Sequence, residues 1–300
     1  MGPSILNNSF GIKAIMKKLY HNLSDDTLSA IYRLYSKLFI RRKRKVGTLT
    51  YQCNICGHIY NCNMSMLKRD SKTCNRCGSS VRMRSIISTL SLELFGKNIP
   101  LYNFPYRPDI MGLGLSDWEG IAFQLRRKFN YKNTFYHKEP KLDIASIDPM
   151  LKGTMDFIIS SDVFEHVNPP IANAFGSLRK LIKPAGVIIF SVPYNKNGED
   201  TIEHFPNLHE YNIVGTEDSY ILKNKTRDGK IQSYDNLCFH GGEGRTLELR
   251  VFTEKSLITE LKIAGFNNIK IYNQPIFESG IYWDNDDSFP MAVRVNEVVK

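Results

Sequence analysis

Apolar runs alternate with helical periods from residue 105 to the end of the chain. Short apolar runs rich in β-branched residues predict strands, and apolar residues spaced three or four apart predict helices. The pattern gives a strand and turn at 107–117, strands at 155–162, 187–193 and 266–273, helices at 118–129, 171–182 and 254–265, and a turn at 183–186. Near-continuous apolar strands separated by helices indicate a parallel sheet covered on both faces. We therefore predict an α/β fold with a doubly wound, mostly parallel Rossmann-like sheet, which binds ligands at the carboxyl ends of its strands.

Two further helices are expected before this region. Residues 23–45 begin with Ser and Asp, place apolar residues at helical spacing, and end in a basic run. Residues 79–96 predict a connector helix that ends near Gly96. The chain is thus divided into a basic helical segment at 1–46, a cysteine-rich unit with its connector at 47–100, and a large domain at 101–300.

Positive charge is concentrated at the N-terminus. The net charge is +10, but residues 1–100 hold 17 Lys and Arg against 4 Asp and Glu, whereas the remainder holds 23 against 26. No run approaches the roughly 18 apolar residues of a membrane span, and no secretory leader pattern opens the chain, so we expect a cytoplasmic protein. The basic segment is either a docking helix with a solvated end or a patch for RNA or for the inner face of an anionic membrane.

Five of the six cysteines lie within 25 residues. Four of them form two C-x2-C pairs separated by 17 residues, and the fifth, Cys62, lies between the pairs. Each pair, with the glycine that follows it, can aim two thiolates at one point, and two such pairs complete a tetrahedron around Zn²⁺. Disulfides are the alternative, but they are uncommon in the cytosol. We predict a zinc ribbon with a structural zinc, because four thiolates leave no position for water. The predicted ligands are Cys53, Cys56, Cys74 and Cys77.

The stretch MDFIISSDVFEHVNPPIANAFGSLRKLIKPAGVIIFSVP, residues 155–193, resembles class I S-adenosylmethionine-dependent methyltransferases. In that family a strand is followed by D-V-x-E-H-V, a helix, R-x-L-K-P-G-G and a strand ending in Pro. The resemblance spans residues 105–275 and is looser at the first glycine loop, where Ile110 stands at the acidic position. It implies cofactor contacts from Gly112, Gly114, Ser116, Asp117, Glu139, Asp143 and Asp162. A solvated surface position is the alternative for Glu139, and a helix cap is the alternative for Asp143.

The segment VFEHV, residues 163–167, is expected to begin the helix after strand 155–162, and the resemblance implies a catalytic role for its residues. A residue just past this strand faces the transferable methyl group in the family. His166 would then be the base that takes the proton of an acceptor hydroxyl, with Glu165 orienting it. Helix capping or pocket shaping by Glu165 is the alternative.

A metal site is a second interpretation of the same segment. DVFEH is similar to the E-x-x-E-H motif of plant-type small-RNA 2′-O-methyltransferases, which bind a divalent metal with a further, distant His. His240 stands at that topological point here. The resemblance implies a Mg²⁺ or Mn²⁺ site, which would polarise a substrate oxygen. Its ligands would be Asp162, Glu165, His166 and His240.

The insertion at 194–250 lies where such enzymes build a substrate lid. Its His, Asn, Gly and aromatic side chains suit a hydroxyl-rich acceptor such as a sugar, although packing of a structural loop is the stronger explanation for any single one of them. Among these residues His240 is the preferred substrate contact, because the glycines at 241 and 242 permit close backbone approach.

These observations favour an O-methyltransferase that acts on a sugar hydroxyl of a glycan or related polyhydroxyl acceptor. The chain resembles bacterial enzymes of polysaccharide biosynthesis that accompany glycosyltransferases and share a ribbon with G-x-S-D, H-G-G-x-G and L-E-x-R elements. A basic N-terminus could associate with a membrane or a glycosyltransferase. RNA methylation through the basic ribbon region and a non-catalytic binding protein with a degenerate cofactor loop are the alternatives.

Overall fold

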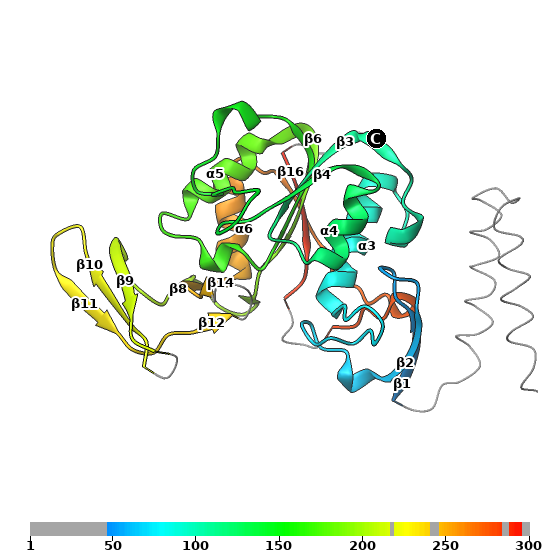
Figure 1. The fold of residues 1–300 in the computed structure, drawn as a ribbon, viewed down its shortest axis with the longest axis horizontal. Coiled ribbons are helices and arrows are strands. Elements are labelled where there is room, and N and C mark those ends of the chain that lie inside the picture. Colours follow the sequence, from blue (N-terminus) through cyan, green and yellow to red (C-terminus); the bar gives the residue numbers. More distant parts are fainter. Residues whose placement is uncertain (1–46, 217–218, 241–245, 284–287, 296–300) are drawn as a thin grey trace, which may run out of the picture.

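The computed structural model describes residues 47–216, 219–240, 246–283 and 288–295. Its centre is a six-stranded sheet in the order β15-β16-β6-β5-β3-β4, with helices on both faces (Figure 1). Strands β3 to β6 are parallel, and β16 runs antiparallel to both of its neighbours. The strands are β3 (Arg107–Leu115), β4 (Phe129–Thr134), β5 (Met155–Ser161), β6 (Ile182–Ser191), β15 (Asn268–Ile271) and β16 (Met291–Arg294). The predicted α/β fold with a mostly parallel sheet is confirmed.

Each face of the sheet has its own core. Helices α3 (Val81–Phe95) and α4 (Glu119–Arg126) pack with Phe157 on one face. Helices α5 (Ala172–Leu181) and α6 (Glu254–Ile263) pack with Ile158 on the other. Successive residues of β5 point to opposite faces of the sheet, and both faces are buried. This double burial explains why the strand is an unbroken apolar run rather than an alternating one.

The helix boundaries follow local chemistry. The side chain of Ser80 accepts a hydrogen bond from the Met83 amide at the start of α3, and Gly96 ends that helix with a left-handed φ of 66°. Helix α6 begins with a capping box between Thr253 and Ser256. These polar caps satisfy backbone groups that the first and last turns of a helix leave without partners.

Two predicted boundaries differ from the structure. The segment 183–186, expected as a turn, lies within β6, where the pairing partner of β5 jumps from Ile182 to Val187. The segment VFEHV was expected to begin a helix. It forms only the 3₁₀ turn η5 (Phe164–His166), and α5 starts after Pro169 and Pro170. Proline has no amide hydrogen and cannot continue a helix, which separates the two elements.

The described residues of the insertion at 194–250 contribute to three small sheets. Its entry and exit pair together, because β14 (Arg250–Thr253) lies between β7 (Tyr194–Asn195) and β8 (Ile202–Glu203). A three-stranded sheet projects from the main body, as the yellow ribbon in Figure 1 shows. The remaining strands are β9 (Glu210–Val214), β10 (Ile221–Lys225), β11 (Ile231–Tyr234), β12 (Phe239–His240) and β13 (Thr246–Leu247).

The cysteine-rich unit at 47–100, called the ribbon below, is built on the hairpin of β1 (Thr48–Gln52) and β2 (Ile59–Asn63). This hairpin lies below α3 in Figure 1. Its apolar residues belong to the same core as the α3 and α4 face of the sheet. Arg84 of α3 is fully buried against the Tyr51 ring and donates to the Gly280 carbonyl at 2.7 Å. The ribbon is therefore packed firmly onto the large domain.

The predicted basic helical segment at 1–46, with the membrane or glycosyltransferase association inferred from it, lies outside the described residues. Among the residues that the structure describes, no helix is long and apolar enough to span a membrane.

Candidate active site

The turn after β5 carries the predicted catalytic residues and is largely buried. Phe164 is fully buried, Glu165 is 1% exposed, and the His166 side chain is 13% exposed. The turn follows the carboxyl end of a central parallel strand, which is the edge where such sheets bind ligands. The predicted residues thus lie at the expected edge of the sheet.

The segment LELR at 247–250 holds this turn in place. The Leu247 carbonyl lies 2.9 Å from His166 Nδ1, and the Leu249 amide donates to the Glu165 carbonyl at 2.8 Å. These contacts join residues more than 80 positions apart in the sequence. The backbone of this segment therefore sets the position of the turn.

Arg250 supplies a second brace from the same segment. Its side chain is fully buried, and Nη1 donates to the carbonyls of Phe164 at 3.0 Å and Val167 at 2.6 Å. Nε pairs with Glu203 at 2.7 Å. A guanidinium can bind several acceptors in fixed directions, so Arg250 fixes both ends of the turn. Sequence reasoning missed this residue, although it noted the L-E-x-R element.

The hydrogen bond to Leu247 determines which nitrogen of His166 is available. A carbonyl only accepts, so Nδ1 carries the proton and Nε2 presents a lone pair. Burial lowers the pKa of His166, which keeps the imidazole neutral at neutral pH. Glu165 Oε1 lies 3.8 Å from Nε2, beyond hydrogen-bond distance. The ring is thus oriented by Leu247, where the sequence predicted Glu165 in that role.

Glu165 has unused hydrogen-bonding capacity. Its Oε2 is buried and has no hydrogen-bond partner among the described residues. Burial, followed by the nearby charge of Asp162, raises the pKa of this carboxyl well above its usual value. A protonated carboxyl donates as well as accepts, and an unpaired buried one is costly unless a ligand satisfies it.

Asp162 forms ion pairs with two arginines that precede the large domain in the sequence. Arg69 of the ribbon binds it in a bidentate manner, with Nη2–Oδ1 at 2.7 Å and Nη1–Oδ2 at 3.0 Å. Arg82 Nε lies 3.0 Å from Oδ2. Asp162 adopts a left-handed φ of 52°, a conformation that Asp tolerates better than most residues. It therefore ties the ribbon to the end of β5.

The predicted metal ligands Asp162, Glu165, His166 and His240 are not brought together as one group. The described residues hold two groups of three or more metal-type donors within 4.8 Å, and neither contains Asp162, Glu165 or His166. His240 instead lies 2.6 Å from Glu248 through Nε2, although its ring centroid is 5.2 Å from that of His166. The other oxygen of Glu248 lies 2.8 Å from His204 Nε2.

The predicted cofactor glycines lie in β3, where the surrounding side chains leave no space for a Cβ. A Cβ at Gly112 would come within 2.2 Å of the Phe157 ring, and one at Gly114 within 2.0 Å of the Tyr131 hydroxyl. Tyr131 donates a short hydrogen bond to Asp117, which is buried. Burial raises the pKa of Asp117 to about 7. Asp117 is thus engaged by the protein's own hydroxyl, and the glycines make room for this polar cluster.

The other predicted cofactor residues lie on the loops after β3 and β4. Ser116 has a left-handed φ of 59°, and its amide donates to the Thr134 carbonyl, so the chain turns sharply between β3 and α4. Glu139 is exposed and accepts from the Lys141 amide at 2.9 Å. Asp143 accepts from the Ala145 amide at 2.9 Å, which stabilises a local turn in the loop after β4. The exposure of Glu139 matches the alternative stated for it, whereas Asp143 does not cap a helix, since the next helical turn, η4 (Pro149–Leu151), is capped by Asp148.

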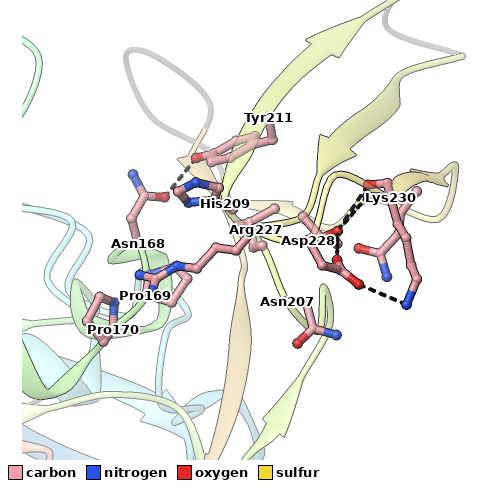
Figure 2. A pocket seen from close by; sticks show the side chains of 12 residues that line it. Asn168, Pro169, Pro170, Asn207, His209, Tyr211, Arg227, Asp228 and Lys230 are labelled. Atoms are coloured by element: carbon pink, nitrogen blue, oxygen red, sulfur yellow. Dashed lines mark hydrogen bonds and ion pairs between the residues drawn. The ribbon is translucent and has the colours of Figure 1, made fainter.

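An open cavity of about 630 Å³ lies between the β9–β11 sheet and the segment after the turn η5. Figure 2 shows Asn168 and Tyr211 on one side, joined by a hydrogen bond of 2.8 Å. Asp228 and Lys230 form an ion pair at 2.8 Å on the other side. The lining residues are Asn168, Pro169, Pro170, Asn207, Leu208, His209, Tyr211, Thr226, Arg227, Asp228, Lys230 and Gln232.

The four predicted zinc ligands converge in the ribbon. The sulfur atoms of Cys53, Cys56, Cys74 and Cys77 lie within 4.8 Å of one another, with Cys53–Cys77 at 3.8 Å and Cys56–Cys74 at 3.6 Å. A tetrahedral zinc with Zn–S bonds of about 2.3 Å separates its sulfurs by about 3.8 Å. The donor set therefore fits Zn²⁺.

The chain is similar to proteins of known structure and to one family profile. No curated protein sequence gives a significant match. Among solved structures, the sugar N-methyltransferase KedS8 from Streptoalloteichus is 10% identical, with a TM-score of 0.41 over 74% of this chain and 89% of that one. An S-adenosylmethionine-dependent methyltransferase from Clostridium acetobutylicum is 14% identical, with a TM-score of 0.37 over 62% and 83%.

The family is given by a sequence profile. The profile of the methyltransferase domain matches residues 98–271, which is more than half of the chain and contains the sheet edge described above. The chain therefore belongs to the methyltransferase domain family and is an S-adenosylmethionine-dependent methyltransferase.

Proposed function

We propose that the protein transfers a methyl group from S-adenosylmethionine to a hydroxyl of a sugar, within a glycan or a related polyhydroxyl acceptor. The observation that carries this proposal is the state of His166. Its Nδ1 is bound to the Leu247 carbonyl, so a neutral imidazole keeps Nε2 as a proton acceptor at the carboxyl end of β5. A hydroxyl is a weak nucleophile until a base removes its proton, which is the role such a nitrogen can perform.

S-adenosylmethionine supplies a methyl group bonded to a positively charged sulfur, and it needs little covalent help from the protein. The cofactor would be held by the sharp loop at Ser116 and by the turn at Glu165. The unpaired buried Oε2 of Glu165 and Oγ of Ser160 offer hydrogen bonds to a polar ligand at this edge. The protein's main tasks are to orient the acceptor hydroxyl and to receive its proton at His166 Nε2.

The cavity next to the turn supports a polyhydroxyl acceptor. Asn168, two residues after His166, forms part of its wall, and Tyr211 offers an aromatic face with a hydroxyl. Amide, carboxylate and hydroxyl groups in one cavity match a ligand that carries many donors and acceptors. Its volume of about 630 Å³ lies within the range of small-molecule sites.

We also propose that the four ribbon cysteines bind a structural Zn²⁺. Arg69 lies in the segment between the two cysteine pairs and reaches Asp162 at the end of β5. Order in the ribbon would thus be transmitted through Arg69 to the catalytic turn. Zinc would have a supporting role here and no part in methyl transfer.

The proposal is tested with S-adenosylmethionine carrying a labelled methyl group. The intact protein is incubated separately with glycan, lipid and RNA fractions, and the label in each acceptor is counted. We expect label in the glycan fraction, bound as an ether that survives mild alkali. His166→Asn should lower the rate by about 10²–10⁴-fold while calorimetry shows cofactor binding unchanged. Label that enters RNA, or a rate that His166→Asn leaves unchanged, would contradict the proposal.

A further inference from the structure

A short hairpin next to the catalytic turn presents metal-binding side chains on one face. Strands β12 and β13 pair with Phe239 opposite Leu247. The Glu248 amide donates to the Cys238 carbonyl at 2.8 Å, so the pairing continues one residue further. Because side chains alternate along a strand, Cys238 and His240 share a face, and Glu248 lies directly across from Cys238 on that face.

The three donor atoms are close enough to share one ion. One ligand atom from each of Cys238, His240 and Glu248 lies within 4.8 Å of the other two. The Glu248 carboxylate is mostly buried, with a side-chain exposure of 12%, and the His240 side chain is 44% exposed. The Cys238 thiol is free and exposed. An ion could therefore reach this face from solvent.

Glu248 is already positioned for such a role by a neighbouring imidazole. His204 Nε2 lies 2.8 Å from Oε1, while His240 Nε2 lies 2.6 Å from Oε2. The backbone of His204 is also fixed, because its amide donates to the Leu249 carbonyl at 2.9 Å. Outer partners of this kind orient a metal-binding carboxylate and are a regular part of metal sites.

We propose that Cys238, His240 and Glu248 form a Zn²⁺ site, with His204 orienting Glu248. A thiolate, an imidazole and a carboxylate together are typical of zinc, whereas Mg²⁺ and Mn²⁺ prefer oxygen ligands alone. Three protein ligands leave the fourth tetrahedral position open for water or a substrate oxygen, unlike the four-thiolate ribbon. This donor set also differs from the metal site that the sequence suggested, with which it shares only His240.

The position of this site gives it a function in acceptor recognition. The ring of His240 lies 5.2 Å from that of His166, centroid to centroid, and Leu247 of the same hairpin binds His166. An acceptor oxygen bound at the open zinc position would therefore lie beside the base. This functional role rests on the proposed methyl transfer, whereas the existence of the metal site does not.

The test counts zinc bound to the full-length protein. Protein saturated with Zn²⁺ and then dialysed is analysed for metal by mass spectrometry. We expect about two zinc ions per wild-type chain and about one in Cys238→Ser and in His240→Asn, since each variant removes one of three ligands. Cys62→Ser and His209→Asn are the matched controls, because neither residue belongs to a donor group, and both should keep about two.

Cobalt substitution identifies which site is filled. The tetrathiolate ribbon and a site with one thiolate give different sulfur-to-cobalt absorption, and Cys238→Ser should remove only the latter. Equal zinc content in the wild type and in both hairpin variants would overturn the proposal, whether or not the protein methylates a sugar. Since His240 is partly exposed, His240→Asn serves as the decisive variant if Cys238→Ser does not fold.

Discussion

The ion pair between Asp162 and two arginines predicts that Asp162→Asn destabilises the protein without distorting its backbone. Asp162 has a φ of 52°, and Asn accepts this left-handed conformation as readily as Asp does. The substitution therefore removes the negative charge and keeps the size and backbone of the residue. Its effect reports the pairing with Arg69 and Arg82.

The burial of the three side chains sets the magnitude. The exposed fractions are 9% for Arg69, 19% for Asp162 and 18% for Arg82. Removing one partner of a buried ion pair costs about 3–5 kcal/mol. Asp70 still contacts both arginines in the variant, although it is half exposed, which reduces the loss. We expect Asp162→Asn to lower the free energy of unfolding by about 2–3 kcal/mol.

Thermal unfolding in a zinc-containing buffer measures this effect. The expected loss corresponds to a fall in Tm of about 4–10 °C for a protein of this size. Asp70→Asn is the matched control, since it contacts the same arginines from an exposed position and should cost less than about 1 kcal/mol. An Asp162→Asn variant that melts with the wild type, or an Asp70→Asn variant that melts at or below the temperature of Asp162→Asn, would refute the reasoning.

Three further predictions follow from the same geometry. Cys74→Ser should lose the ribbon zinc and lower methyl transfer roughly tenfold or more, since folding of a zinc ribbon depends on its metal; metal content and rate measured on one sample check this. Because the folded pKa of Asp117 is about 7, above its unfolded value, the native state keeps a proton that the unfolded state loses, and stability should fall by about 3–4 kcal/mol between pH 4 and 7. Asp117→Asn should flatten this slope in urea unfolding at several pH values, and an unchanged slope would exclude the assignment. Arg250→Lys keeps the charge but loses the hydrogen bonds to two carbonyls, so kcat should fall roughly tenfold at nearly constant KM. Glu203→Gln removes only the ion pair with Arg250, and an equal fall in its kcat would show that the ion pair, not the carbonyl bonds, positions the turn.

The sequence was sufficient to predict the alternating elements and the place of the polar residues after β5. An unbroken apolar run such as MDFIIS indicates a central strand, and the polar residues after it must lie at the carboxyl edge of a parallel sheet. The spacing of the cysteine pairs predicted the convergence of four sulfurs for a similar reason, since each pair is a local turn. Local patterns such as these survive folding unchanged.

The partners of the predicted residues could not be predicted, because they come from distant segments. Arg69 is 93 positions from Asp162, and Arg250 is 86 positions from Phe164. An arginine in a sequence is far more often a solvated surface residue than a buried brace. Nothing local distinguishes Arg250 from its exposed counterparts, and only the tertiary packing shows that its side chain is fully buried.

The central claim is that His166 removes a proton from a sugar hydroxyl. The most direct test is the pH dependence of methyl transfer to the glycan fraction by the wild type and by His166→Asn. Because burial lowers the pKa of His166, the wild-type rate should rise with pH to a plateau, and the rise should lie at lower pH than that of an exposed imidazole. His166→Asn should lose both the rise and about 10²–10⁴-fold of the plateau rate. A variant that keeps the wild-type pH profile, or a wild type that labels only RNA, would contradict the account.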